Sequence, residues 1–162
     1  MQHEKNYKVC FIGHRDFYKD DLLKNEIENQ IKQGADFFTM GTHGKFDQSA
    51  LWFCKEFRKK YENIKIEVVI TSFNKLKKIL IHDDIFGKEY YDPYKDVDTV
   101  MFEIEELYFK KRITESNKQM IDGCDVLVCY VNPKKTYGGA KFALDYATKK
   151  GLKIVNLYDK KN

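Results

Sequence analysis

Three glycine-bearing segments hold the residues of this chain that are best suited to bind a small molecule. They are Gly13-His14-Arg15, Gly41-Thr42-His43-Gly44 followed by Asp47, and Tyr137-Gly138-Gly139-Ala140-Lys141. Glycine allows a backbone to approach a ligand closely, while basic, acidic and imidazole side chains exchange hydrogen bonds and protons with it. These residue types predict a site for a small, charged ligand.

The segment around Gly138 and Gly139 joins an apolar run to an amphipathic one, so the glycines are expected at the N-terminus of a helix. Unpaired N–H groups and the helix dipole favour an anion there. Lys141, just past Ala140, adds a point charge suited to a phosphate. The alternative is that the glycines form only a tight turn and that Lys141 faces solvent.

Arg15 and Asp47 are the charged residues of the other two segments. The Arg15 guanidinium suits a phosphate or carboxylate, although a surface ion pair would also explain it. Asp47 is expected in the first turn of a helix, where the dipole favours a carboxylate as a structural group. In a binding site it would accept hydrogen bonds from ribose hydroxyls or a base amine and would avoid phosphate.

Two imidazoles and one amide complete the candidate set. His14 and His43 could hold a metal ion with Asp47, but no spacing of metal ligands requires one. We therefore expect no metal and no other cofactor. Asn117 is expected on a helix that leads into a strand, where it could supply a polar contact.

Short apolar runs precede the three segments and predict the strands that position them. The expected strands are Tyr7–Ile12, Asp36–Met40, Ile64–Ile70, Asp98–Phe102, Asp125–Val131 and Lys153–Leu157. Helices are expected from Asp20 or Asp21 to near Gly34, from about Lys45 to Tyr61, from Glu105 to Asp122 with an interruption near Thr114, and after Gly139. The almost wholly apolar Asp125–Val131 run is typical of a strand buried on both faces of a parallel sheet.

Alternation of strands and helices predicts βαβ units, a mostly parallel central sheet and helices on both of its faces. We therefore expect an α/β three-layer sandwich, as a single domain over residues 1–162. In such a sheet the three glycine segments meet at the carboxyl edge, where open α/β folds bind ligands. Their convergence supports a site more strongly than any one glycine does.

The segment between the third and fourth expected strands has no clear pattern. Asn74–His82 is weakly helical, and Gly87–Lys95 resembles an irregular loop rich in tyrosine. Such a loop could cover a ligand pocket or pack over the sheet edge. The aromatic residues of Glu89–Tyr94 suggest either a lid or the surface of a homodimer.

Composition narrows the classes of partner. The net charge is +4 with lysines scattered among acids, so the basic stripe of a nucleic-acid surface is missing and nucleic acid is not the expected partner. No apolar run has the length of a membrane span, and the N-terminus lacks a signal-peptide core, so no membrane partner is expected. Four cysteines without Cys-x-x-Cys spacing indicate reduced thiols and predict a cytoplasmic location.

Four motifs, in order along the chain, resemble a known family. They are Phe11-Ile12-Gly13-His14-Arg15, then Gly34-Ala35-Asp36-Phe37-Phe38 leading to Gly41-Thr42-His43-Gly44-Lys45-Phe46-Asp47, then Asn117-Lys118-Gln119-Met120-Ile121-Asp122, and Tyr137-Gly138-Gly139. With them the chain resembles the YpsA-like branch of the SLOG superfamily, which also holds the LOG phosphoribohydrolases and the Smf/DprA proteins. The resemblance covers nearly the whole chain. It implies a bacterial protein with a Rossmann-like fold whose strand-end loops bind a nucleotide or nucleotide-derived ligand. Because dimers are usual in the related LOG proteins, the resemblance also leads us to expect a symmetric homodimer.

Departures from the family pattern bear on catalysis. Ser116 stands where relatives often have arginine, and Ala140 stands where they often have threonine. The LOG enzymes carry Pro-Gly-Gly-x-Gly-Thr-x-x-Glu. Counted from Gly138, this chain keeps both glycines and has Asp145 at the acidic position, but Lys141 and Phe142 replace the Gly-Thr pair.

Two functions are therefore open. In the first, the protein binds a nucleotide as a sensor or sequestering module. In the second, it is an N-glycosidase of nucleoside monophosphates or related nucleotides, in which Asp47 or Asp145 would be the catalytic carboxylate that steadies an oxocarbenium ion and activates water. We favour binding, because the motifs support a pocket more strongly than a complete catalytic set. Binding of single-stranded DNA, by analogy with Smf/DprA, lacks the basic stripe it would need.

Overall fold

A six-stranded parallel sheet forms the centre of the computed structural model, which describes residues 6–72, 76–102 and 109–160. The strands lie in the order β6-β3-β2-β1-β7-β8. Their bounds are β1 Lys8–Gly13, β2 Phe37–Met40, β3 Lys65–Val69, β6 Asp98–Val100, β7 Val126–Tyr130 and β8 Lys153–Asn156. All neighbouring pairs run parallel, which confirms the expected α/β class with a mostly parallel central sheet.

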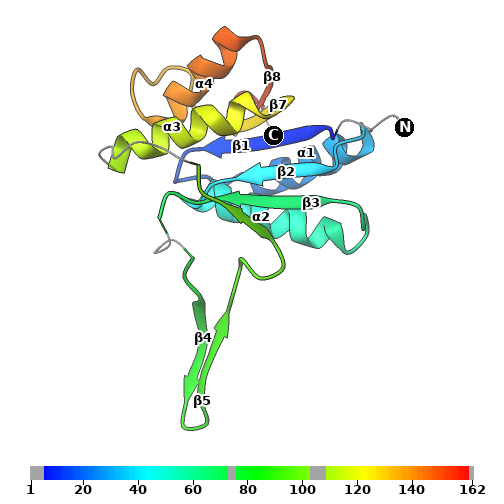
Figure 1. Cartoon of the computed structure of the whole chain (residues 1–162), viewed down its shortest axis with the longest axis vertical. Coiled ribbons are helices and arrows are strands. Elements are labelled where there is room, and N and C mark those ends of the chain that lie inside the picture. The colour runs from blue at the N-terminus through cyan, green and yellow to red at the C-terminus, as the bar shows by residue number, and fades with distance from the viewer. Residues whose placement is uncertain (1–5, 73–75, 103–108, 161–162) are drawn as a thin grey trace.

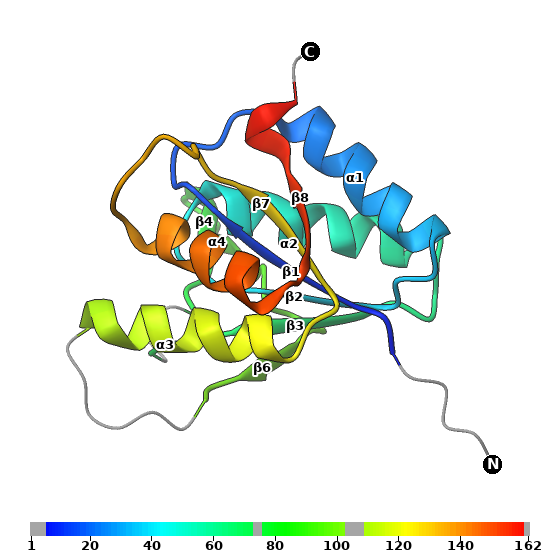
Figure 2. The same ribbon diagram turned by 90° about the horizontal axis from the view of Figure 1, so that it is seen from above.

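Helices cover both faces of this sheet and complete the three layers (Figure 2). Their bounds are α1 Asp20–Lys32, α2 Lys45–Arg58, α3 Phe109–Asp122 and α4 Gly139–Lys150. Helices α1 and α2 pack into one cluster of buried residues with one side of the sheet, while α3 and α4 pack into a second cluster with the other side. The pair Ala143 and Ala147, one turn apart, shows how the helical period of the sequence sets the buried face of α4.

Strand β7 lies in the interior and contributes to both clusters. All five of its residues are buried. Val126, Val128 and Tyr130 belong to the cluster under α1 and α2, whereas Leu127 and Cys129 belong to the cluster under α3 and α4. The run therefore has no polar side, because successive side chains of a strand point to opposite faces and here both faces are covered.

The order of the strands reverses between β1 and β7. From β1 the chain builds outward through β2, β3 and β6, and it then returns to place β7 and β8 on the other side of β1. The register pairs Ile12 with Cys129 and Gly13 with Tyr130, so the ends of these two strands are level. An open α/β sheet leaves a crevice at such a reversal, outside the carboxyl ends of the strands. The expectation that the strands ending near Ile12, Met40 and Val131 lie side by side is confirmed.

A two-stranded antiparallel hairpin projects from the body of the protein (Figure 1). It consists of β4, Ile79–Asp84, and β5, Gly87–Tyr91. The predictions of a weak helix over Asn74–His82 and of an irregular loop over Gly87–Lys95 were therefore wrong, although residues 73–75 lie outside the described part of the chain. Pairing with a second strand stabilises this segment as β-structure, and the positive φ of Gly87 (123°) suits the tight connection.

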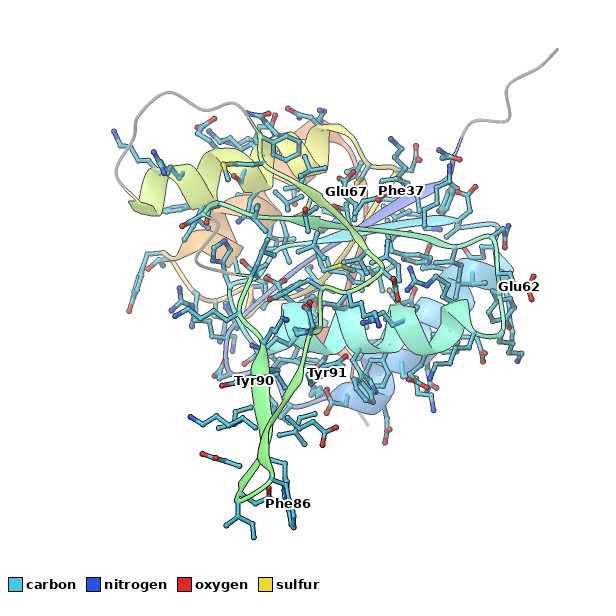
Figure 3. The ribbon with its side chains drawn as sticks, turned by 60° about the horizontal axis from the view of Figure 1, so that its bottom comes forward. Phe37, Glu62, Glu67, Phe86, Tyr90 and Tyr91 are labelled. Carbon is cyan, nitrogen blue, oxygen red and sulfur yellow. The ribbon has the colours of Figure 1, made fainter. Side chains whose placement is uncertain are left out.

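The tip of the hairpin carries two apolar side chains with almost no cover. Ile85 is 93% exposed and Phe86 is 91% exposed, and Figure 3 shows Phe86 at the far end of the arm. The Phe86 N–H donates to Asp84 Oδ1 at 2.8 Å and shapes the turn. The turn at the tip is thus held by a local hydrogen bond from the backbone to a side chain, and the tip contributes little to the buried core.

Helix α3 runs without a break through Thr114, so the predicted interruption there was wrong. The expected helical residues from Glu105 to Tyr108 lie outside the described part of the chain. No helix among the described residues has the length and apolarity that crossing a membrane would need.

Candidate functional site

A cavity of about 700 Å³ opens at the reversal between β1 and β7, and we call it the switch-point cavity. Its wall is formed by the loop after β1, the loop after β2, helix α3 and the loop that enters α4. The described residues that line it are Phe11, Ile12, Gly13, His14, Arg15, Asp16, Gly41, His43, Asp47, Ile113, Thr114, Asn117, Lys135, Tyr137, Gly138, Gly139, Ala140 and Phe142. The structure therefore brings ten of the residues chosen from sequence to one cavity: Gly13, His14, Arg15, Gly41, His43, Asp47, Asn117, Gly138, Gly139 and Ala140.

His14 joins the ends of β1 and β7. Its backbone N–H donates to the Tyr130 carbonyl at 3.0 Å, and its Nε2 accepts the Asn132 N–H at 2.9 Å. Burial and the nearby Lys135 charge lower the pKa of His14, which favours the neutral ring. Since Nε2 is the acceptor, the proton of the neutral imidazole lies on Nδ1. His14 thus holds the loop after β7 in place at the rim of the cavity.

The hydrogen bond between His14 and Asn132 predicts that removing the His14 imidazole lowers the stability of the protein. His14→Ala leaves the Asn132 N–H without its acceptor, so the free energy of unfolding in urea is expected to fall by about 1–3 kcal/mol. His82→Ala is the matched control, because His82 is exposed and pairs with Asp84 on the hairpin, away from the sheet. Equal losses in the two variants would contradict a structural role for His14.

Arg15 is a cation at the wall of the cavity, and the next residue of the chain, Asp16, lines the same cavity. The side chain is exposed at the cavity wall, and no ion pair joins it to an acidic residue of the described ranges. Gly44 packs against its backbone, since a Cβ added to Gly44 would lie 3.0 Å from Arg15 Cα. Gly44 is therefore needed for close packing that positions Arg15, and it does not itself line the cavity.

The glycines of the three segments serve different purposes. A Cβ on Gly13 would lie 2.4 Å from Cγ of the Phe46 ring, so this glycine allows β1 to pack against α2. Gly138 has a φ of 112°, which favours glycine at the entry to α4. A Cβ on Gly139 would meet no atom within 4 Å. Packing of the described residues thus leaves the Gly139 position free, and the open space belongs to the cavity.

Of the two carboxylates among the described residues that line the cavity, Asp16 and Asp47, only Asp47 was chosen from sequence. Its Oδ2 accepts the His43 N–H at 3.0 Å, and protein encloses the group except where it opens onto the cavity. Burial raises the pKa of Asp47 to about 6, against the lowering effect of the His43 hydrogen bond. A carboxyl group with this pKa can exchange a proton near neutral pH.

Lys141 and Asp145 do not take part in the cavity. Lys141 Nζ lies 2.9 Å from Asp145 Oδ1, one turn along the surface of α4, and neither residue lines either cavity described here. Their spacing of four residues is the usual spacing of a surface ion pair on a helix. The structure gives no support to Lys141 as a phosphate ligand or to Asp145 as a catalytic carboxylate.

A second cavity of about 630 Å³ adjoins the first, and we call it the aromatic chamber. Gly41 and Asp47 line both cavities. The other described residues of the chamber are Thr42, Gln48, Leu51, Trp52, Lys77, Lys78, Ile79, Tyr91, Pro93 and Tyr94. Tyr91, Pro93 and Tyr94 come from the segment that was predicted to be a lid or a packing loop, whereas Trp52 was not identified from sequence.

The site offers no evident place for a metal ion. Within the described ranges, no group of three His, Cys, Asp or Glu side chains lies close enough together to hold one.

Comparisons with known proteins bear on the fold. No protein-family model matches the chain, and no curated protein matches it. DNA processing protein A (DprA) from Streptococcus pneumoniae is similar in structure, with a TM-score of 0.59 and 15% sequence identity over 95% of this chain and 52% of that chain. The probable mandelate racemase from Alicyclobacillus acidocaldarius aligns over 92% of this chain and 41% of its own, but its TM-score of 0.32, at 15% identity, is too low to support an argument.

The likeness to DprA shows a shared fold and nothing about activity, because sequence identity is so low. It agrees with the Rossmann-like fold implied by the resemblance to the SLOG superfamily. This chain spans about half the length of the DprA chain.

Proposed function

We propose that the protein binds a nucleotide or nucleotide-derived ligand in the switch-point cavity and acts as a sensor or sequestering module. One observation carries the proposal: the N-terminus of α4 and the Arg15 guanidinium lie at the same cavity, at the strand reversal. The YpsA-like motifs of the sequence favour the same kind of ligand.

The entry to α4 has the chemistry of a phosphate subsite. Helical hydrogen bonding begins at Phe142, whose N–H donates to the Gly138 carbonyl at 3.0 Å. The N–H groups of the preceding residues in the first turn have no helical acceptor, and the helix dipole makes this end positive. Arg15 and Lys135 add positive charges at the same cavity, which also contains the carboxyl groups of Asp16 and Asp47. A phosphate there would receive backbone and charge-assisted hydrogen bonds.

Asp47 supports the alternative of an N-glycosidase. Its carboxyl group lies at the cavity with a pKa raised to about 6 by burial, which suits a general acid or base. The second carboxylate considered, Asp145, is paired with Lys141 outside the cavity. We favour binding because the lining supports a phosphate subsite more strongly than a complete catalytic set: of the carboxylates chosen from sequence only Asp47 lines the cavity, and the other described carboxylate there, Asp16, directly follows Arg15 in the chain.

The phosphate subsite is tested by removing the Arg15 charge. Arg15→Gln is expected to weaken the binding of a nucleoside monophosphate by about 10–100-fold, because a charge-assisted hydrogen bond contributes about 1.5–3 kcal/mol. The dependence of affinity on salt concentration should also become shallower. Calorimetric titration with a panel of nucleoside monophosphates at two salt concentrations measures both effects.

Lys24→Gln is the matched control, because Lys24 is an exposed cation of α1 outside both cavities. The affinity of this variant for nucleoside monophosphates, and the dependence of that affinity on salt concentration, should equal those of the unaltered protein. A panel in which no nucleotide binds, or an Arg15→Gln variant that binds like the control, would contradict the proposal.

A further inference from the structure

The aromatic chamber shares Gly41 and Asp47 with the switch-point cavity, and it contains none of the residues assigned above to the phosphate subsite. We propose that it holds the base of the nucleotide and selects a base with an exocyclic amine, such as adenine or cytosine. This inference rests on the proposed function and adds to it the placement of the two ends of the ligand: phosphate at α4, base in the chamber.

An aromatic platform lines the chamber. Trp52, the one tryptophan of the chain, is 51% exposed although it lines a cavity, so much of its indole is open to a ligand. The Tyr91 ring lies 6.3 Å from it at an angle of 67°. Exposed aromatic rings in a cavity stack on the flat face of a base, and such stacking accepts every base.

Contacts from α2 hold the opposite wall in place before any ligand arrives. Lys55 Nζ donates to the Pro93 carbonyl at 3.2 Å and lies 5.6 Å from the centre of the Tyr91 ring. Arg58 donates to the Asp96 carbonyl at 2.8 Å, further along the same segment. Because these contacts fix the backbone that carries Tyr91, binding would require little ordering of the wall.

Polar groups at the chamber supply the selectivity. Asp47 uses Oδ2 to accept the His43 N–H, and a carboxylate has further lone pairs for a second donor. The Thr42 hydroxyl oxygen is buried and has no hydrogen-bond partner among the described residues. An exocyclic amine donates to the Asp47 carboxylate, whereas the carbonyl oxygen of hypoxanthine or uracil would face it with lone pairs and be repelled.

The fluorescence of Trp52 provides a direct test, because no other tryptophan contributes to the signal. The unaltered protein is titrated with two matched pairs, AMP with IMP and CMP with UMP, and with ribose 5-phosphate, which lacks a base. At least one aminated nucleotide should quench the fluorescence and bind at least tenfold more tightly than its oxo counterpart. Ribose 5-phosphate should bind weakly, with no quenching.

Variants separate the chamber from the phosphate subsite. Trp52→Ala should weaken binding of the preferred nucleotide at least fivefold by calorimetry and leave the affinity for ribose 5-phosphate unchanged, while Trp52→Phe should retain most of the affinity. Phe86→Ala is the control, since this exposed aromatic ring lies on the hairpin tip outside both cavities.

Two outcomes would overturn the inference in distinguishable ways. In the first, ribose 5-phosphate binds as tightly as every nucleotide, or the two nucleotides of each pair bind with equal affinity and do not quench the fluorescence. The chamber is then not a base site, and the phosphate subsite stands. If no probe binds, the proposed function fails together with the inference.

Discussion

Gly139→Val is expected to abolish nucleotide binding while the protein remains folded. The position is the first residue of α4, and a Cβ there would meet no atom within 4 Å, so the protein can accept the side chain. The same side chain would occupy the space in which a phosphate approaches the backbone N–H groups. Thermal-shift titration with the nucleotide panel should show an unchanged melting temperature without ligand and no ligand-induced increase.

Gly123→Val is the matched control for this experiment. Gly123 is exposed at the end of α3, and a Cβ there would meet only backbone oxygens at ordinary contact distances of 3.7 and 3.8 Å. This variant should bind like the unaltered protein. A ligand-induced shift that persists in Gly139→Val would mean that the glycines serve only the turn.

Asp47→Asn is expected to make the protein more stable and its binding weaker. The pKa of Asp47 is raised by burial to about 6 from an ordinary value of 3.8, so the folded state binds the proton more tightly than the unfolded state does. The contribution of Asp47 to stability therefore falls as pH rises from about 4 to about 6, by about 1–3 kcal/mol in total. Asparagine cannot ionise, so the stability gained by the variant should be small at pH 4 and largest above pH 6, as measured by urea unfolding.

Loss of the charged acceptor should at the same time reduce nucleotide affinity by about 1–3 kcal/mol. Asp145→Asn is the matched control, because Asp145 is exposed, pairs with Lys141 and lies outside both cavities. It should change stability by less than about 1 kcal/mol and leave affinity unaltered. If the free energy of unfolding of Asp47→Asn depended on pH as that of the unaltered protein does, ionisation of the buried Asp47 carboxyl group would not destabilise the folded state.

The same variant distinguishes a binder from an enzyme. Chromatography after long incubation with nucleoside monophosphates, their deoxy forms and NAD measures release of free base. We expect none. Release over many turnovers that disappears in Asp47→Asn, with affinity nearly unchanged, would show that the carboxylate acts in the transition state and would favour the N-glycosidase.

The sheet could be predicted because its strands carry their own signal. Val126–Tyr130 is apolar at every position, and such a run between turn residues is typical of a central parallel strand. The glycine segments then had to follow strands at one edge. These strand signals are local in sequence and can be recognised without knowing the fold. Once the sheet is known to be parallel, the segments of Gly13, Gly41 and Gly138 must meet at its carboxyl edge.

The hairpin and the chamber could not be predicted in the same way. The short apolar run Ile79–Ile81 suits a helix or a strand, and only its pairing with β5 decides between them. Trp52 lies on an amphipathic helix, and nothing in its spacing shows that Tyr91 from a distant segment meets it. The pairing of Lys141 with Asp145, by contrast, had a signal in the sequence, because a spacing of four residues brings opposite charges together on the surface of a helix.

The hairpin and the chamber share residues. Ile79, where β4 begins, is paired with Tyr91, where β5 ends, and both line the chamber, while Figure 3 shows Tyr91 at the base of the arm and Phe86 at its far end. The arm and this wall of the chamber are therefore parts of one hairpin. If a contact at the tip were to move Tyr91, the affinity of the chamber would change, and by reciprocity a filled chamber would change the strength of that contact. Such coupling would connect the occupancy of an internal cavity with the outermost point of the molecule.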